Sequence, residues 1–325
     1  MLEGIIVKST GSWYTVRTES GEYSCRIKGK FRLDGVKLTN PVAVGDNVGI
    51  EIEDEGERTG TIREILPRRN YILRQSPRKK HYMHLMVANI DQALLIVTIR
   101  EPELKPGFID RFLLTTEPHD IPVIIVFNKT DLYSIEDISV LERLEEVYSG
   151  IGYKTLRTST VTGEGIDHLK RLLVDKTTAV NGQSGVGKSS LINAIQPGKE
   201  LKIGDLSDYT GKGQHTTTFA EMYTLHFEMD NDKDRQGNAW IIDTPGLKTL
   251  GFNNLEVQDV AHNFREFFEH SHSCKFRDCT HRNEPGCAVK KAIETGEISM
   301  IRYENYLMIL DNIEEQNYWE RHKDF

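Results

Sequence analysis

The period of the hydrophobic positions changes at about residue 87. Before this point, five short segments alternate bulky and polar residues between glycine turns: residues 4–8, 13–17, 23–27, 47–52 and 60–65. Such alternation is typical of strands with one buried face, and about five strands at this spacing predict a small barrel of the oligonucleotide-binding (OB) type. Beyond this point, continuous apolar runs at 93–99 and 123–127 indicate strands that are buried on both faces of a parallel sheet.

Helical patterns follow these runs at residues 139–148 and 166–173, and further strand-like runs lie at 177–180 and 239–242. Strands that alternate with helices predict an α/β domain. After about residue 256 the pattern is helical, and it ends in a helix over residues 301–313. We therefore expect a multidomain protein with four segments: an OB-like barrel at 1–68, a basic linker at 69–86, an α/β domain at 87–252 and a helical domain at 253–325.

The composition is that of a globular protein. Of 325 residues, 38% are hydrophobic and 28% are charged, which excludes a fully disordered chain. The apolar run at 93–99 is too short for a transmembrane helix, which needs about 20 apolar residues. The first residues lack the basic and apolar regions of a secretory signal. We therefore expect a cytoplasmic protein with no membrane partner.

Charge is distributed unevenly along the chain. The net charge is −8, yet residues 1–80 contain 15 Lys or Arg against 11 Asp or Glu, so this part is locally positive. The basic residues of segment 66–86 lie among prolines and aromatic residues: Arg68, Arg69, Arg74, Arg78, Lys79 and Lys80. This composition suits a nucleic-acid backbone, but a solvated linker explains it equally well.

Residues 182–189, GQSGVGKS, match the phosphate-binding pattern G-x-x-x-x-G-K-[ST]. Glycines allow the backbone N–H groups to point at phosphates, the ammonium group of Lys188 supplies charge, and the hydroxyl of Ser189 can coordinate Mg²⁺. The strand-like run 177–180 precedes the loop, and a helical pattern at 190–195 follows it. This context favours a nucleotide-binding loop at the N-terminus of a helix.

Residues 128–131, NKTD, follow an apolar run. The N1–H and 2-amino groups of guanine are adjacent donors that one carboxylate can accept, whereas adenine has no such pair on that edge. Asp131 therefore predicts selection of guanine, although an Asx turn is the other interpretation of this motif. Asn128 can bridge loops, and the stem of Lys129 can cover the base. Ser159 can support the base from a neighbouring loop.

Residues 243–246, DTPG, follow a second buried strand. An acid at the end of such a strand can hold Mg²⁺ through water, so Asp243 is the expected ligand, and the N–H group of Gly246 is expected at the γ-phosphate. Between the two phosphate motifs lies GKGQHTTT at 211–218. Its glycines and threonines are typical of a switch that becomes ordered with nucleotide, in which Thr217 is the expected Mg²⁺ ligand.

The order of these motifs is unusual. In ordinary GTPases the phosphate-binding loop comes first, whereas here both guanine motifs precede it. This order resembles that of the circularly permuted GTPases. A permutation can keep the same sheet because the termini of a domain often lie close together. It also places the segment after Gly246 directly before the C-terminal domain.

Three of the four cysteines lie close together. The pattern Cys274-x4-Cys279-x-His281-x5-Cys287 supplies three thiolates and one imidazole, a set that suits tetrahedral Zn²⁺ in a closed structural site. No position is left open for water, so we assign this site no catalysis. Buried free cysteines beside a chance histidine are the alternative, which the clustering disfavours.

The barrel, the permuted motifs and the cysteine–histidine pattern together resemble the RsgA family of bacterial GTPases, also called YjeQ or EngC, over nearly the whole chain. The matching stretches include 182–191, 213–218 and 278–289. The resemblance implies hydrolysis of GTP to GDP and phosphate, stimulation by the 30S ribosomal subunit, contact with its 16S rRNA and a late role in maturation of that subunit. We also expect Mg²⁺ with GTP, one structural Zn²⁺ and a monomer.

The GTP-binding residues that we expect come from separate motifs: Asn128, Lys129, Thr130, Asp131, Ser159, Asn181, Gly182, Gln183, Ser184, Gly185, Val186, Gly187, Lys188, Ser189, Ser190, Asp243 and Gly246. Many GTPases place a glutamine after D-x-x-G to orient water, but this chain has Leu247 there. His215 in the switch is the nearest alternative for a catalytic group. A contact of His215 with RNA or solvent explains the histidine at this position equally well.

Two other functions remain open at this point. A P-loop ATPase or kinase would explain the phosphate motif, but Asp131 argues against it. A non-hydrolysing scaffold that senses GTP and binds RNA would use the same residues. Turnover of GTP distinguishes this scaffold from an enzyme.

Overall fold

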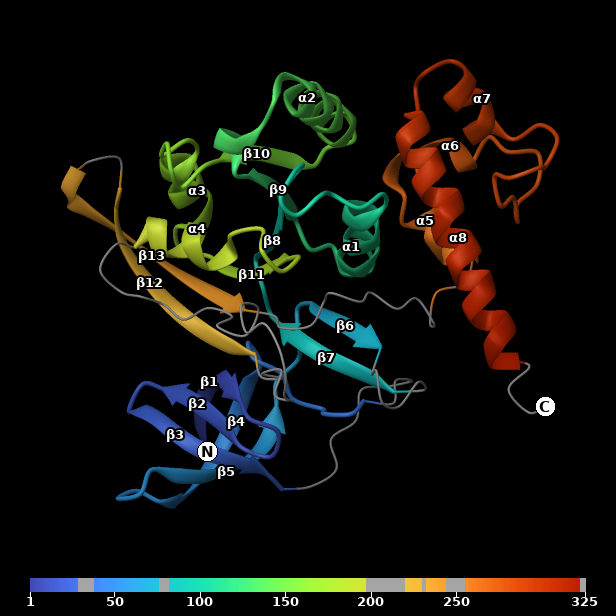
Figure 1. Cartoon of the computed structure of the whole chain (residues 1–325). Coiled ribbons are helices and arrows are strands. Elements are labelled where there is room, and N and C mark those ends of the chain that lie inside the picture. Colours follow the sequence, from blue (N-terminus) through green and yellow to red (C-terminus); the bar gives the residue numbers. More distant parts are fainter. Residues whose placement is uncertain are drawn as a thin grey trace.

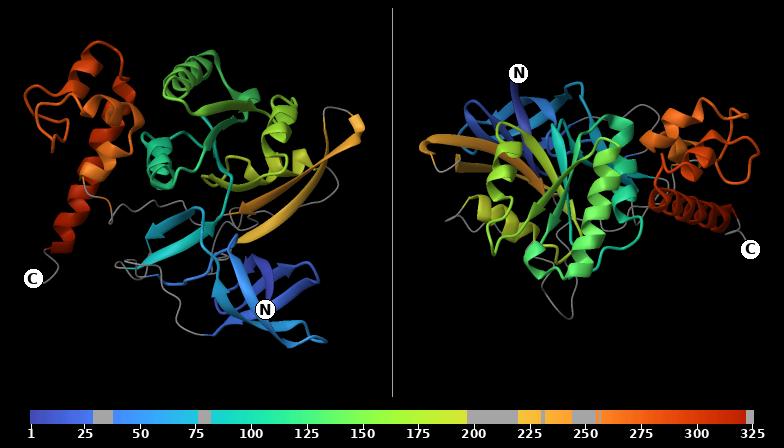
Figure 2. Two further views of the ribbon diagram at one scale, coloured as in Figure 1. Left: turned by 180° about the vertical axis from the view of Figure 1, so that it is seen from behind. Right: turned by 90° about the horizontal axis from the view of Figure 1, so that it is seen from above.

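The computed structural model describes residues 1–28, 38–75, 82–196, 220–229, 232–243, 255 and 257–321. The chain folds into an N-terminal barrel, a central α/β domain and a helical C-terminal domain (Figure 1). The C-terminal domain lies beside the α/β domain and apart from the barrel (Figure 2). The multidomain fold class that the sequence predicts is confirmed.

Five strands close the barrel: β1 (Leu2–Ser9), β2 (Tyr14–Thr18), β3 (Gly21–Ile27), β4 (Asn47–Asp54) and β5 (Thr59–Ile65). Strand β1 pairs with both β2 and β4, and β5 links β3 to β4, so the sheet closes on itself. The side chains of Ile6, Val16 and Ile62 are fully buried. The barrel that the alternating pattern predicts is therefore confirmed.

The segment that we expected to be a linker contains an antiparallel ribbon. Strands β6 (Tyr71–Gln75) and β7 (Met83–Ala88) pair with each other, and residues 76–81 between them lie outside the described residues. Neither strand contains a proline, so no N–H group of the ladder is lost. The expectation of an irregular linker is wrong for these two strands.

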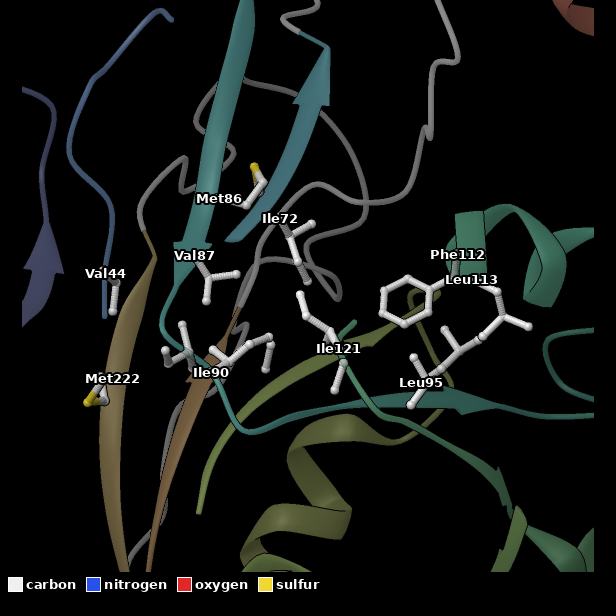
Figure 3. Close-up of a cluster of buried hydrophobic side chains, with 14 of the residues drawn as sticks. Val44, Ile72, Met86, Val87, Ile90, Leu95, Phe112, Leu113, Ile121 and Met222 are labelled. Atoms are coloured by element: carbon white, nitrogen blue, oxygen red, sulfur yellow. The ribbon is translucent and has the colours of Figure 1, made fainter. Parts of the chain in front are cut away.

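Apolar side chains of this ribbon join the barrel to the α/β domain. Ile72 and Val87 are fully buried, and they belong to one cluster with Val44 of the barrel and Phe112 of the α/β domain (Figure 3). The N–H group of Ala88 also donates to the carbonyl of Val44 over 3.0 Å. The barrel and the α/β domain therefore share one hydrophobic core.

Six strands form the sheet of the α/β domain, in the order β10-β9-β8-β11-β13-β12. They are β8 (Gln92–Val97), β9 (Val123–Asn128), β10 (Lys154–Thr158), β11 (Thr177–Gly182), β12 (Glu221–Met229) and β13 (Asp232–Asp243). All pairs are parallel except β12 with β13. Strands β8 and β9 are buried along their whole length, as their apolar runs predict.

Helices cover both faces of this sheet. They are α1 (Phe108–Thr116), α2 (Ile135–Gly150), α3 (Ile166–Leu173) and α4 (Lys188–Ile195), with two short 3₁₀ helices, η1 (Glu117–His119) and η2 (Thr130–Leu132). Side chains of α1 and α2 share a core with Leu95, whereas those of α3 and α4 share a core with Leu94. Adjacent strand residues thus point to opposite faces.

Strand β12 also pairs with β1 of the barrel, with Lys8 opposite Glu221. The barrel and the α/β domain are therefore parts of one sheet of eleven strands. The hairpin of β12 and β13 extends along the side of the α/β domain, and β12 begins next to the barrel (Figure 1).

Four helices of the C-terminal domain are described: α5 (Val257–His262), α6 (Arg265–Ser271), α7 (Ala288–Glu294) and α8 (Met300–Arg321). Phe264, Phe267 and Tyr306 form the centre of its core. The helix predicted over 301–313 is confirmed and continues beyond that range. Within the described ranges, every helix is too short or too polar to cross a membrane.

Candidate nucleotide and zinc sites

Two loops that follow β9 and β10 carry the predicted guanine motifs. Asp131 is exposed, and its Oδ1 accepts a hydrogen bond of 2.5 Å from the hydroxyl of Ser159. The Ser159 oxygen itself accepts the N–H groups of Val161 and Thr162. The carboxylate of Asp131 is thus held in place by Ser159, and a carboxylate has lone pairs enough to accept further hydrogen bonds from a ligand.

Asn128 ties these loops to the phosphate-binding loop. Its Nδ2 donates to the carbonyl of Val186 over 2.8 Å, and its Oδ1 accepts the hydroxyl of Thr158 over 2.9 Å. The amide is buried, and a buried amide that is paired at both atoms orients the loops around it. The Nζ of Lys129 donates to the carbonyl of Glu101 over 2.8 Å.

Tyr133 belongs to this site, and sequence reasoning missed it. Its hydroxyl donates to the carbonyl of Asn128 over 2.7 Å and accepts the N–H of Ile99 over 2.9 Å. Burial raises the pKa of Tyr133 to about 12, so the phenol stays protonated and able to donate at neutral pH. The only signal in the sequence is an aromatic residue two positions after the NKTD motif.

The phosphate-binding loop 182–189 connects β11 to α4. Three of its positions require glycine, and Gly185 is one of them with a φ of +85°. A Cβ at Gly182 would lie 2.3 Å from the carbonyl oxygen of Ile96, and Gly187 has a φ of +89°. The Nζ of Lys188 donates to the carbonyls of Gly182 and Gln183 over 2.9 and 2.8 Å. A loop of this form with an ammonium group folded onto it can hold phosphate groups.

Two of the oxygen donors predicted for Mg²⁺ lie beside this loop. Ser189 is in the first turn of α4, and Asp243 is the last residue of β13. Because β13 is the parallel neighbour of β11, both residues lie at the same edge of the sheet, and a hydroxyl with a carboxylate suits Mg²⁺. The Nδ2 of Asn181 is buried without a hydrogen-bond partner among the described residues.

Thr130 lies in η2, where its hydroxyl donates to the carbonyl of Thr158 over 3.3 Å, and Ser190 lies in the first turn of α4. Three other predicted residues are Gly246, Thr217 and His215. All three lie outside the described residues. Their roles stay predictions, as does the GTP-binding set as a whole.

Cys274, Cys279, His281 and Cys287 come together between α6 and α7. Their ligand atoms all lie within 4.8 Å of one another. The Nδ1 of His281 lies 3.7 Å from the Sγ of Cys274 and 3.4 Å from the Sγ of Cys287, so Nδ1 is the ring atom that faces the thiols. Three thiols and one imidazole at these distances fit one structural zinc ion.

The surroundings of the cluster suit a metal. Burial raises the pKa of the Cys279 thiol to about 12, so this thiol keeps its proton unless a metal binds, and binding of Zn²⁺ releases it. The N–H groups of Ala288 and Lys290 point at the sulfurs of Cys274 and Cys287 over 3.3 and 3.4 Å. Such donors stabilise thiolate charge.

Glu284 braces the loop that carries these ligands, and sequence reasoning gave it no role. Its carboxylate accepts the N–H and hydroxyl groups of Thr280 and the N–H of Arg282. Burial alone would raise the pKa of Glu284, but these hydrogen bonds lower it to about 2. The carboxylate is therefore charged at neutral pH.

Comparison with known proteins identifies the family. Residues 65–253 match the family model described as RsgA GTPase, and residues 3–62 match the RsgA N-terminal domain. The chain belongs to the RsgA family. Among curated RsgA proteins, the small ribosomal subunit biogenesis GTPase RsgA of Phocaeicola vulgatus is 47% identical over 318 residues, which are 98% of this chain and 99% of that protein.

Solved structures extend the RsgA likeness to the fold. YjeQ from Thermotoga maritima superposes with a TM-score of 0.73 at 36% identity and covers 96% of this chain and 98% of its own. YloQ, described as a circularly permuted GTPase, has a TM-score of 0.68 at 31% identity, with 97% and 96% covered. The permuted order is therefore confirmed, and this RsgA-family protein is a GTPase.

Proposed function

We propose that this RsgA-family GTPase acts in the cytoplasm, as a monomer, in late maturation of the small (30S) ribosomal subunit. It binds the 16S rRNA, and the subunit stimulates its GTP hydrolysis. The observation that carries the proposal is the similarity along the whole chain to relatives named small ribosomal subunit biogenesis GTPase, at 47% and 46% identity. The local positive charge of residues 1–80 supports an anionic partner.

Guanine is selected by the carboxylate of Asp131, which accepts the N1–H and 2-amino groups of the base. Ser159 holds this carboxylate, and Asn128 links its loop to the phosphate-binding loop. The hydrogen bonds among these residues support the assignment because they orient the acceptor before the base arrives. The backbone N–H groups of residues 182–189 then face the phosphates, with the ammonium of Lys188 at the β- and γ-phosphates.

Mg²⁺ is held by the hydroxyl of Ser189, by Thr217 and, through water, by Asp243. When bound, the ion neutralises charge on the β- and γ-phosphates. The chain contributes a hydroxyl at the start of α4 and a carboxylate at the end of β13. Both are oxygen donors, which fits the preference of Mg²⁺.

His215 positions the attacking water or accepts its proton. Leu247 can do neither, so the isolated protein should hydrolyse GTP slowly. Binding of the subunit shifts the switch toward the ordered state that brings His215 to the nucleotide. His215→Ala should lower subunit-stimulated turnover by roughly 10²–10⁴-fold while binding of GTP and of the subunit persists. Near-normal stimulated turnover would assign this role to the ribosome or to backbone groups, and loss of subunit binding alone would make His215 a docking residue.

The experiment that tests the whole proposal is GTP turnover with and without purified 30S subunits. Stimulated turnover supports it. The other outcome is that the protein binds both GTP and the subunit, but the subunit does not raise its rate of GTP hydrolysis. In that case a GTP-sensing scaffold is the better description. An excess of ATP should not compete with GTP, because adenine lacks the donors that Asp131 accepts.

A further inference from the structure

The start of β12 is a junction between the barrel and the nucleotide site. The predicted switch at 211–218 precedes this strand in the sequence. The first residue of β12, Glu221, lies opposite Lys8 of β1 on one side and opposite Asp243 of β13 on the other. A single residue of β12 therefore stands between the barrel and a proposed Mg²⁺ ligand.

The barrel holds the start of β12 through one side-chain contact and one backbone hydrogen bond. The Nζ of Lys8 lies 3.1 Å from each carboxylate oxygen of Glu221, and the N–H of Ser9 donates to the carbonyl of Ala220 over 3.3 Å. Strand β1 is irregular between Ile6 and Lys8. Such a bulge redirects the side chains that follow it, and here the redirected residue is the one that pairs with β12.

Glu221 and Asp243 share one electrostatic environment. Residues directly opposite each other in an antiparallel pair point to the same face, with Cβ atoms about 5 Å apart. Tyr223 lies two residues along β12, and its hydroxyl donates to Glu221 over 3.3 Å. Burial, together with the negative charges of Glu221 and Asp243, raises the pKa of Tyr223 to about 12. Both carboxylates therefore act on the same phenol.

We propose that Glu221, held and partly neutralised by Lys8, is a positioning residue that tunes the Mg²⁺ affinity of the site at Asp243. This inference rests on the proposed role of Asp243 in Mg²⁺ binding. A second carboxylate beside Asp243 attracts Mg²⁺, and the ammonium group of Lys8 weakens that attraction. The barrel thereby influences the nucleotide site through its own first strand.

The test compares Lys8→Met with Glu221→Gln. Both changes break the same ion pair, but they alter the charge near Asp243 in opposite directions. The experiment measures the rate at which a fluorescent GDP analogue dissociates from the protein at increasing Mg²⁺ concentration. The measured quantity is the Mg²⁺ concentration at which half of the full decrease in this rate is reached. Lys8→Met should lower this concentration and Glu221→Gln should raise it, each by roughly two- to tenfold, because the pair is partly exposed and solvent weakens such effects. The double variant should return close to the wild-type value.

Arg17→Met is the matched control. Arg17 of β2 donates to the hydroxyl of Thr224 over 3.2 Å, so this change removes a barrel cation at the same junction but farther along β12 from Asp243. It should leave the Mg²⁺ midpoint unchanged.

A purely structural contact predicts a different result. Lys8→Met and Glu221→Gln would then shift the midpoint in the same direction, or lower the thermal unfolding temperature without any shift, and either outcome overturns the inference. If release of the GDP analogue from the wild-type protein does not depend on Mg²⁺, the proposed Mg²⁺ site itself is wrong.

Discussion

Asp131 is the residue on which nucleotide choice depends in our proposal. Replacement by asparagine keeps the size of the side chain but turns one acceptor into a donor. Hydrogen bonds to a charged group contribute about 1.5–3 kcal/mol, so Asp131→Asn should weaken GTP binding by roughly 10- to 100-fold. Preference should shift toward xanthosine triphosphate, whose base has a carbonyl where guanine has its 2-amino group. Titrations with both nucleotides measure the two affinities.

The control for this change is Asp167→Asn. Asp167 lies on α3, where its half-exposed carboxylate pairs with Lys170, and the same chemical change there should leave both affinities as they are. GTP affinity that is unaltered in Asp131→Asn would contradict the assignment of the guanine site.

Residues whose chemistry requires one side chain at one spacing could be predicted from the sequence. Asp131 and Ser159 meet in the structure, and the cysteine–histidine cluster does as well. Tyr133 and Glu284 could not be predicted. Their roles depend on which backbone N–H and carbonyl groups come within hydrogen-bond distance, and the folded chain alone determines that.

At the scale of elements, apolar runs predicted the buried strands but not the strands at edges. Strand β10 reads KTLRT and forms on the outer side of β9, where a run of apolar residues is not needed. The sequence pattern did not predict the ribbon of β6 and β7 for another reason. Its prolines and all of the named basic residues except Arg74 lie outside the strands, and the average composition of the segment hid the two short apolar stretches.

The zinc-binding loop is an element whose fold should depend on its metal. Cys279→Ser removes one of four ligands, so we expect loss of bound zinc and unfolding of the C-terminal domain at a lower temperature, since metal affinity is coupled to folding. The loss of affinity should exceed the 10- to 100-fold that removal of an outer partner causes. Zinc content by mass spectrometry and thermal unfolding measure the two effects. The control is Cys25→Ser, which changes a buried cysteine of the barrel and should leave the zinc content unchanged. A Cys279→Ser protein with an unchanged thermal unfolding temperature would refute a structural role of the zinc.

The basic residues of segment 66–86 are the second feature with a testable role. Arg68 pairs with the buried Asp46 over 2.6 Å and Arg69 with Asp91 over 2.7 Å, so these two arginines are engaged within the protein. We propose that Arg78, Lys79 and Lys80, outside the described residues, contact rRNA. Their reversal to glutamate should weaken 30S binding and reduce its salt dependence, by about 0.7–0.9 in slope for each phosphate that the segment no longer neutralises, while basal hydrolysis persists.

Reversal of Lys170 and Arg171 on α3 is the control for this experiment. It changes the net charge by four units rather than six and lies on the α/β domain, so it should leave the salt slope as it is. An unchanged slope in the variant of the basic segment would make that segment only a connection between strands.

At the scale of the whole molecule, two kinds of joint connect the domains. The barrel meets the α/β domain through shared apolar side chains. The C-terminal domain meets it through Leu114 of α1, which belongs to the core of that domain, and also through charged groups: Arg302 with Asp110, and Arg265 with Glu117. The order of the domains could be predicted from the sequence, but this second joint could not, because Arg302 and Asp110 are 192 residues apart and nothing in a local pattern pairs them.

Arg302 is the centre of the charged joint. Its guanidinium is buried between the carboxylates of Asp110 and Glu266, and it lies 4.1 Å from the ring centre of Phe264. The hydroxyl of Tyr148 also donates to Asp110 over 2.8 Å. Among the described residues, both carboxylates pair with this one arginine.

Arg302→Met should destabilise the attachment of the C-terminal domain because it leaves two buried carboxylates without their cation. Removal of one partner from a buried ion pair typically costs about 3–5 kcal/mol. Release of zinc to a chelator during a urea titration should therefore begin at a clearly lower urea concentration. The combined change of Arg302→Met, Asp110→Asn and Glu266→Gln should recover most of the loss, since no unpaired charge then remains buried. Arg265→Met, at a partly exposed pair with Glu117, should have a smaller effect, and an unaltered urea profile in Arg302→Met would show that the joint does not depend on this arginine.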